Sequence, residues 1–253
     1  MTQSDQNSSN EQHLALKERK NESYKIFDDI ATTYDPLNRF LSLGIDVRWR
    51  HRMRKELPQK PNLEILDLAT GTADVPLILI KNSNISKIRG LDMSKNMIAI
   101  GDQKILKANL EEKITLGIGD GCALPEKDNT WDVTTVSFGI RNFPDYFKGL
   151  QEMFRVLKPG GQIMVMEFSL PTNFLIRAIY LFYFRKVLPF IGNIFSGHGD
   201  AYSYLNKTVE DFPYGEDFIN KMKEAKFIET RAIPLTFGIA TLYIGKKPQV
   251  VKP

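Results

Sequence analysis

The sequence predicts an α/β fold with a mostly parallel β-sheet, and three observations carry this prediction. Between positions 63 and 168, short apolar segments that end in small or acidic residues alternate with helical segments. Two further apolar segments follow near the end of the chain. With 253 residues, of which 42% are hydrophobic and 25% charged, the chain has an ordinary globular composition and enough length for one α/β domain.

The chain before residue 61 is assigned to a tail and a helical segment. Residues 1–12 are rich in Ser, Asn, Gln and Thr, and we expect a disordered tail there. Residues 13–60 are interpreted as a helical lid or substrate segment. A helix is expected over about residues 14–35, with these residues on one face: Tyr24, Phe27, Ile30, Ala31 and Tyr34. Because a proline disfavours helical geometry in the residue before it, Pro36 predicts a break at Asp35.

Residues 61–247 are expected to form the main domain. Five strands are predicted at residues 63–68, 87–92, 114–120, 131–139 and 162–168. Helices are predicted between them at residues 75–80, 94–108 and 145–157. An aromatic helical insertion at about residues 172–206 precedes a helix at 211–225. Strands at 227–235 and 238–245 complete a seven-stranded sheet, with the last two paired antiparallel at one edge.

Charge and cysteine content exclude several classes of protein. The net charge is +4 with scattered basic residues, so no nucleic-acid partner is expected. A single cysteine, Cys122, excludes an intrachain disulfide framework, and no metal site is predicted. The longest segment without a charged residue or histidine has 14 residues, Ala232–Gly245, whereas a membrane-spanning helix needs about 20. The polar start of the chain lacks the apolar stretch of a secretory signal, so we expect a cytoplasmic location.

Two strand ends carry residues typical of a nucleotide site. The first is the turn from Asp67 to Asp74, where small residues around Gly71 allow backbone N–H groups to approach a ligand. It is neither a G-x-G-x-x-G motif nor a phosphate loop, and a tight packing turn is the alternative. The second is Asp92, whose carboxylate could accept both hydroxyls of a ribose or could instead begin the next helix.

Two further strand ends are expected at the same edge of the sheet. Asp120 and Gly121 follow the third strand and could recognise an adenine, with an ordinary turn as the alternative. Ser137, Arg141 and Asn142 follow the fourth strand, where the last two could contact a substrate or act as a solvated arginine and a helix cap. Four such loops at one edge, in this order, describe a site for S-adenosylmethionine (SAM).

At this point the chain resembles the ubiquinone/menaquinone biosynthesis C-methyltransferase family over roughly residues 24–247. The motifs that carry the resemblance are YDPLNRFLSLGIDVRWR, LDLATGTAD, GLDMSKNM, ALPEKDNTWDVTTVSFGIRN, FRVLKPGG and MEFSLP. Of these, SFGIRN and the amino-terminal YD-x-x-N segment are specific to the family, whereas LDLATGTAD and LKPGG occur in many SAM methyltransferases. The resemblance implies the class I, Rossmann-like SAM-dependent methyltransferase fold.

The resemblance also implies site residues. It implies Arg141 and Asn142 on the catalytic, substrate-facing side. It implies that the following residues bind SAM: Asp67, Gly71, Thr72, Asp92, Met93, Asp120, Gly121 and Ser137. Ala69 and Ala73 stand where the general methyltransferase turn has glycine, and the menaquinone branch of the family resembles this chain in tolerating both.

The implied reaction is methylation of a ring carbon of a polyprenylated quinol. YFRKVLPFIG, FPYGEDF and LTFGIATLYIGKKP resemble the menaquinone branch, so demethylmenaquinol is the expected substrate and a ubiquinone-pathway benzoquinol the alternative. Ionising a phenol with a pKa near 10 is uphill by roughly 4 kcal/mol at pH 7. Arg141 could stabilise the phenolate, and water, Asp28 or His198 could take the proton.

Other interpretations remain open at the sequence level. An RNA or protein N-methyltransferase is disfavoured because SFGIRN stands where such enzymes resemble [ND]-P-P-[YF]. A nicotinamide oxidoreductase is disfavoured by the missing G-x-G-x-x-G motif. A non-catalytic scaffold of a quinone-synthesis complex is a third alternative. The aromatic and basic residues of 174–195 suit peripheral contact with the inner face of the cell membrane, although a core helix explains them equally well. A homodimer is a further expectation.

Overall fold

One sheet organises the part of the chain that the computed structural model describes, namely residue 20, residues 22–187 and residues 208–249. Its seven strands have the order β3-β2-β1-β4-β5-β7-β6. Their bounds are β1 Leu63–Leu68, β2 Ile85–Asp92, β3 Ile114–Ile118, β4 Trp131–Ser137, β5 Leu157–Phe168, β6 Ile228–Leu235 and β7 Ala240–Lys246. Strands β1 to β5 pair in parallel, and β7 pairs antiparallel with both β5 and β6. The predicted α/β class and antiparallel pairing are confirmed, with β7 one position inside the edge.

Helices cover both faces of the sheet. Their bounds are α2 Ser23–Leu41, α3 Ile45–Lys55, α4 Asp74–Leu79, α5 Lys95–Lys107, α6 Tyr146–Val156, α7 Phe174–Phe182 and α10 Glu216–Glu224. Short 3-10 turns, η1 Ile140–Asn142 and η3 Thr236–Gly238, and a π-helical turn, η2 Tyr183–Val187, complete the described elements. None of the described helices is both long and apolar enough to cross a membrane.

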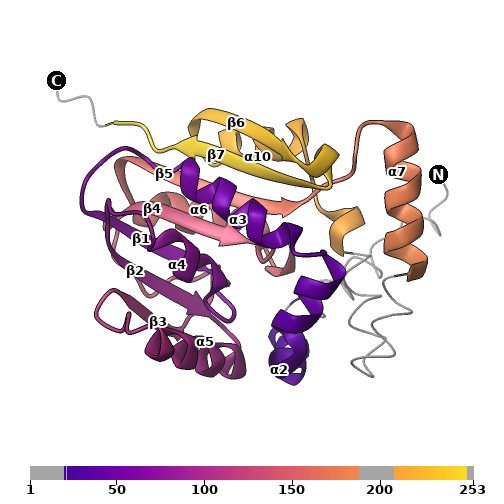
Figure 1. Cartoon of the computed structure of the whole chain (residues 1–253). Helices are drawn as coiled ribbons and strands as arrows, with labels where there is room; N and C mark the ends of the chain where they lie inside the picture. Colours follow the sequence, from indigo (N-terminus) through magenta and orange to yellow (C-terminus); the bar gives the residue numbers. More distant parts are fainter. Residues whose placement is uncertain (1–19, 21, 188–207, 250–253) are drawn as a thin grey trace.

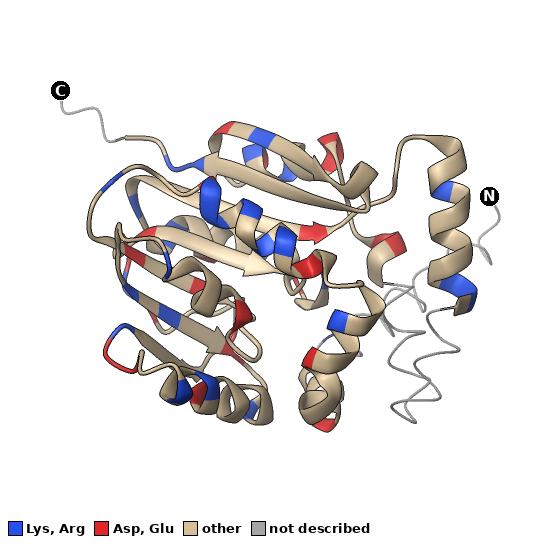
Figure 2. Ribbon diagram, viewed as in Figure 1, with Lys and Arg blue, Asp and Glu red and all other residues tan. Residues whose placement is uncertain are grey.

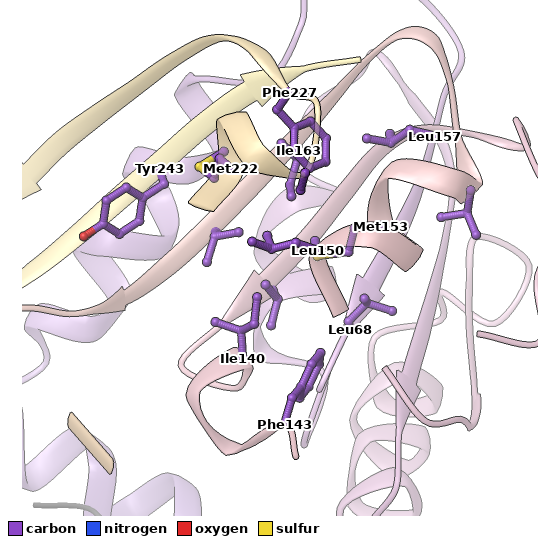
Figure 3. Packing of buried hydrophobic residues seen from close by; sticks show 14 of the residues in the cluster. Leu68, Ile140, Phe143, Leu150, Met153, Leu157, Ile163, Met222, Phe227 and Tyr243 are labelled. Atoms are coloured by element: carbon purple, nitrogen blue, oxygen red, sulfur yellow. The ribbon is translucent and has the colours of Figure 1, made fainter. Parts of the chain in front are cut away.

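Alternation along the buried strands divides the core into two layers. In β5, Ile163 and Val165 face the cluster that contains α6 and α10, whereas Met164 and Met166 face the cluster that contains α3, α4 and α5. Figure 3 shows side chains of the first cluster converging between the sheet, α6 and α10. The sheet is therefore buried on both sides, as expected for parallel strands with helical crossovers.

The sequence-based boundaries are wrong at several places, among them the start of β5, which lies at Leu157 rather than at residue 162. Helix α2 continues through Pro36. Asp35 accepts a hydrogen bond from Thr72 and forms an ion pair with Lys104, and these contacts offset the backbone hydrogen bond that the proline removes. Helix α10 begins at Glu216 rather than at residue 211, since Gly215 adopts φ 62° and ψ −131°. Helix α3 was not predicted as a separate helix, although it lies within residues 13–60, which were expected to be helical. The insertion expected at residues 172–206 is described only through α7 and η2, and its remainder lies outside the described residues.

The strand order places the site. Strand β1 pairs with β2 on one side and β4 on the other, so the chain reverses its winding direction between β1 and β4. Loops that follow such strands diverge and leave a crevice at their carboxyl ends. Figure 1 shows the arrowheads of β2, β4 and β5 pointing toward α2 and α7, which lie beyond that edge of the sheet.

A buried carboxyl supports the turn after β1. Asp67 accepts hydrogen bonds from Thr70 Oγ1 at 2.7 Å and from Thr135 Oγ1 at 2.5 Å. Desolvation by burial raises the pKa of Asp67 to about 7, against the bonds from the two hydroxyls, which lower it. The folded protein therefore binds a proton at this carboxyl in a pH range where the unfolded chain does not.

We expect Asp67→Asn to change how stability depends on pH. Because the folded pKa lies above the unfolded one, ionising Asp67 costs stability as pH rises from about 4 to about 7, by up to about 1.4 kcal/mol per pH unit. Asparagine removes this term. The free energy of unfolding of both proteins is measured with urea at several pH values. The difference between wild type and Asp67→Asn should change with pH across this range and be constant above it. A difference that is constant from pH 4 to 7 would contradict the raised pKa.

Candidate active site

A cavity lies at the carboxyl ends of the first four strands, and we call it the strand-end cavity. It is about 90 Å³, because side chains of α2 reach into it. Its lining comes from the turn after β1, the end of β2, the loop after β3, the segment after β4 and α2: Lys20, Ser23, Tyr24, Phe27, Tyr34, Ala69, Gly71, Asp92, Met93, Met97, Gly119, Asp120, Gly121, Ser137, Phe138, Gly139, Asn142, Phe143 and Pro144. The four strand ends singled out in the sequence thus meet in one place.

Asp92 is positioned at this cavity by two backbone groups. Its carboxylate accepts from the N–H of Gly71 at 2.8 Å and from the N–H of Ser94 at 2.8 Å. Desolvation by burial raises the pKa of Asp92, against the lowering effect of these bonds. A carboxylate has about four acceptor positions, so Asp92 keeps capacity for the hydroxyls of a ligand.

The loop after β3 forms the far side of the cavity. Asp120 accepts from the N–H of Cys122 at 2.8 Å, which closes a tight turn. Gly121 lies against the ring of Phe143, and a Cβ at this position would come within 2.3 Å of that ring. Only glycine therefore fits here, while Met93, 39% exposed, lines the cavity from the end of β2.

Buried polar atoms without partners mark the cavity wall at β4. Among the described residues, Ser137 Oγ and Asn142 Oδ1 are buried and make no hydrogen bond within the protein. Leaving such groups unsatisfied costs about 1–3 kcal/mol each, which a polar ligand would recover. Together with the carboxylates of Asp92 and Asp120, these atoms offer hydrogen-bond acceptors and one hydroxyl that fit the ribose hydroxyls and the adenine amino group of SAM.

Two of the predicted SAM-binding residues lie outside the cavity lining. Asp67 lies beneath the turn, bonded to Thr70 and Thr135. Thr72 donates to Asp35 of α2 at 2.7 Å and accepts from Lys104 of α5 at 3.0 Å. Both residues therefore shape the turn and its neighbours rather than border the cavity.

A larger cavity adjoins the first, and we call it the apolar cavity. Its volume is about 460 Å³, within the range of pockets for small organic ligands. It is lined by Ile26, Phe27, Ile30, Thr33, Tyr34, Leu37, Asn38, Phe40, Leu41, Ser42, Leu43, Ile45, Asp46, Trp49, Arg50, Phe138, Arg141, Asn142, Phe168, Tyr180, Tyr183, Phe184, Thr236 and Ile239. Most of these side chains are aliphatic or aromatic, so the cavity suits a greasy ligand with few polar groups.

The two cavities share a wall. Phe27 and Tyr34 of α2, with Phe138 and Asn142 after β4, line both. Burial raises the pKa of the Tyr34 phenol, so this group stays neutral at physiological pH. A ligand in each cavity would therefore meet its neighbour across these four side chains.

Arg141 faces the apolar cavity and belongs to a buried ion pair. Its Nη1 donates to Glu167 Oε1 at 2.7 Å and to the carbonyl of Phe138 at 2.5 Å. Its guanidinium also stacks over the ring of Phe168, 5.3 Å from the centroid. Burial raises the pKa of Glu167, and the charge of Arg141 opposes that rise. Arg141 Nε has no partner among the described residues, so one donor remains for a ligand.

The other charged side chains at the apolar cavity are paired with one another. Asp46 of α3 binds both Arg39 and Arg50, and Arg39 continues to Asp74 at 2.6 Å. Of the proton acceptors suggested by the sequence, Asp28 is bound by Ser94 and Asn96 at the start of α5 and lines neither cavity. His198 lies outside the described residues.

Several residues at the cavities were not predicted. Helix α3 contributes Trp49 and Arg50, and the spacing of Ile45, Trp49 and Met53 by four residues was the signal for it in the sequence. Glu167, the partner of Arg141, lies near the end of a largely apolar strand, and no local sequence signal predicts its pairing with Arg141. The helical face of α2 was recognised, and it does line both cavities.

Comparison with known proteins places this chain among close relatives. A ubiquinone/menaquinone biosynthesis C-methyltransferase UbiE from Geobacter sulfurreducens is 44% identical over 92% of this chain and 91% of its own length. Demethylmenaquinone methyltransferases are similarly close: that of Bacteroides fragilis is 41% identical over 88% of this chain and 91% of its own, and that of Thermus thermophilus is 42% identical over 88% and 100%.

Solved structures support the fold at lower identity. A SAM-dependent methyltransferase from Thermotoga maritima matches with a TM-score of 0.62, at 20% identity over 88% of this chain and 99% of that one. Phosphoethanolamine N-methyltransferase 2 of Haemonchus contortus, solved with SAM, matches with a TM-score of 0.58 at 15% identity, over 78% of this chain and 51% of that one. The class I SAM methyltransferase fold is therefore confirmed. The model of the ubiE/COQ5 methyltransferase family matches residues 14–247, and the chain belongs to that family.

Proposed function

We propose that this chain transfers a methyl group from SAM to a ring carbon of demethylmenaquinol, giving menaquinol. The observation that carries the proposal is the shared wall between a polar strand-end cavity and a large apolar cavity. The first has the polar groups that SAM requires, mainly hydrogen-bond acceptors, and the second has the size and surface for a quinol ring with part of its prenyl tail. A reaction between the two ligands needs this adjacency, because in-line approach of carbon and methyl supplies much of the rate.

SAM supplies a methyl group that leaves a cationic sulfonium, so the acceptor carbon needs only enough electron density to attack it. The chain raises that density by favouring an ionised hydroxyl on the acceptor ring. Arg141 lines the apolar cavity and precedes Asn142 of the shared wall, and its unpaired Nε can donate to a phenolate oxygen. A guanidinium keeps its proton in proteins, so Arg141 stabilises the anion and does not take the proton.

The residues that line the apolar cavity narrow the choice of proton acceptor. Asp46 is the carboxylate that lines the apolar cavity in the described part of the chain, and two arginines hold it. Asp28 is engaged at the start of α5. These contacts disfavour Asp28. Of the other two acceptors expected from the sequence, His198 lies outside the described residues, and water can enter at the mouth of the cavity.

The naphthoquinol is favoured over the benzoquinol by the relatives. Menaquinone stands in the printed name of each relative described above, whereas ubiquinone stands in only one of them. Incubating the protein with radiolabelled SAM and either demethylmenaquinol or its benzoquinol counterpart tests the choice. A non-catalytic scaffold would label neither.

The mouth of the apolar cavity supports peripheral membrane contact. Phe40 and Leu43 line this cavity and yet are 57% and 83% exposed, so the cavity opens to solvent beside these two residues. Beside it, α7 exposes Phe174, Leu175, Ile179 and Phe182 on its outer face. Figure 2 shows basic residues on α7 and the adjoining η2, and neither element contains an acidic residue. We infer that this side of a cytoplasmic protein meets the inner face of the cell membrane, where its substrate resides. The homodimer stays a prediction of the sequence.

Asp92→Ala should weaken SAM binding by more than tenfold, because the carboxylate that would accept the ribose hydroxyls is lost. Isothermal titration with SAM measures the change. Asp102→Ala, at an exposed aspartate of the adjoining helix α5, is the matched control and should bind as wild type. An unchanged titration of a folded Asp92→Ala protein would remove Asp92 from the SAM site.

Arg141→Ala should lower methyl transfer at least a hundredfold and leave SAM affinity nearly unchanged, since Arg141 lines only the apolar cavity. Removing the arginine also leaves Glu167 buried and unpaired, which costs about 3–5 kcal/mol of stability. Arg141→Lys keeps a cation beside Glu167 and separates the two effects. If SAM affinity fell as far as turnover in a folded Arg141→Lys protein, Arg141 would belong to the SAM site.

Leu43→Asn should weaken binding to liposomes with anionic lipid at low salt. Asparagine accepts the left-handed conformation of this position, φ 51°, so the turn is kept while the apolar side chain is lost. Leu106→Asn removes an exposed leucine from α5, away from the cavity mouth, and serves as control. Flotation measures the bound fraction, and equal flotation of both variants would argue against docking through this mouth.

A further inference from the structure

Tyr180 places a buried phenol on the α7 side of the apolar cavity. Its side chain is 8% exposed and lines the apolar cavity together with residues of the segment after β4. Among the described residues its hydroxyl has no hydrogen-bond partner. A hydroxyl that is removed from water and left unpaired destabilises the fold, so a polar group on a ligand is the partner that this position lacks.

A neighbouring tyrosine has the usual arrangement, in which the hydroxyl makes a hydrogen bond within the protein. Tyr183 lines the same cavity, and its hydroxyl donates to the carbonyl of Leu41 at 2.9 Å. The hydroxyl of Tyr183 is thereby used within the protein, in a bond that ties η2 to the end of α2. Both tyrosines line one cavity, but Tyr180 of α7 is buried and has no partner for its hydroxyl among the described residues, whereas Tyr183 of η2 is only partly buried and has one.

Packing fixes the direction of the Tyr180 ring. It stacks on Phe184, with centroids 5.3 Å apart and an interplanar angle of 24°. Phe184 contacts Phe168, and Phe168 lies under the guanidinium of Arg141. A chain of aromatic contacts thus connects Tyr180 with the arginine that faces the substrate, and it leaves the Tyr180 hydroxyl little freedom to find another partner.

Resting on the proposed function, we propose that Tyr180 binds the acceptor directly, by donating a hydrogen bond from its hydroxyl to one oxygen of the quinol ring. A quinol carries two oxygens at opposite positions of its ring. Arg141 and Asn142 approach the ring from the segment after β4, and Tyr180 approaches from α7, so the two oxygens meet polar groups on two sides of an otherwise apolar cavity.

The phenol of Tyr180 acts as a donor and not as a base. Burial raises its pKa above the ordinary value of a tyrosine, and the nearby charge of Arg141 only partly opposes this rise. The group therefore stays protonated at physiological pH. A neutral phenol can stabilise a developing phenolate by a charge-assisted hydrogen bond, but it cannot accept the proton that the acceptor loses.

Tyr180→Phe tests the assignment because it removes one oxygen and keeps the ring. We expect kcat/KM for short-chain demethylmenaquinol to fall roughly 10- to 100-fold, with unchanged SAM affinity and a thermal midpoint that is equal to or above that of wild type. Tyr183→Phe should instead lower the midpoint by several degrees, because it breaks the bond to Leu41. Tyr146→Phe, on α6 outside both cavities, is the control for purification and assay.

Acceptor analogues identify the oxygen that Tyr180 contacts. The two isomeric prenylated naphthols, each lacking one quinol hydroxyl, are measured as inhibitors of wild type and of Tyr180→Phe. We expect one isomer to bind both proteins equally and the other to bind Tyr180→Phe at least tenfold more weakly. Equal losses with both isomers would show a general change of the cavity and overturn the assignment.

The outcomes separate this inference from the proposed function. Wild-type protein that methylates no quinol contradicts the function itself. Wild-type activity together with an unchanged kcat/KM in Tyr180→Phe contradicts the role of Tyr180 alone. A fall in the thermal midpoint of Tyr180→Phe as large as that of Tyr183→Phe would show that its hydroxyl is already satisfied within the fold, and this too would overturn the proposal.

Discussion

The buried pair of Arg141 and Glu167 holds the segment on which both cavities depend. Glu167 lies at the end of β5 and is fully buried, and its carboxylate accepts from the guanidinium and from the backbone N–H of Arg141. Arg141 in turn binds the carbonyl of Phe138, which has a left-handed backbone conformation, φ 58°. Such backbone strain persists only where surrounding contacts overdetermine it. The ion pair thus fixes Phe138 and Asn142, the two residues of this segment that border both cavities.

Helix α2 closes the other side of both cavities, and polar contacts hold it in place. Asp28 binds the start of α5, Asp35 binds Thr72 and Lys104, and Arg39 binds Asp46 and Asp74. The residues of α2 that face the cavities are instead mostly aromatic or aliphatic. This division explains why α2 tolerates Pro36. Charged groups along one face attach the helix to its neighbours. These contacts contribute more stability than the missing backbone hydrogen bond costs.

The sequence contained the strands and their ends but not the partners across the fold. Each strand end has a local signal, such as the acid after β2 or the glycine-flanked acid after β3, and parallel strands bring such ends together. Glu167 has no such signal, because only the pairing of β4 with β5 brings it near Arg141. For the same reason, Asp67 and Thr72 belong to the expected turn by sequence, yet their side chains point to Thr135 and Asp35 rather than to the cavity. Contacts between distant segments decide both cases.

An apolar cavity creates a conflict that the few polar groups in it resolve. A prenylated ring enters such a cavity readily, since burial of apolar surface drives it. The same surroundings oppose ionisation of the ring hydroxyl, because a desolvated anion is costly. The charge of Arg141 is already shared with Glu167, so a second donor adds stabilisation where the arginine alone is weakened. A neutral phenol, such as that of Tyr180, can provide this donor without adding a second buried charge that would itself need a partner.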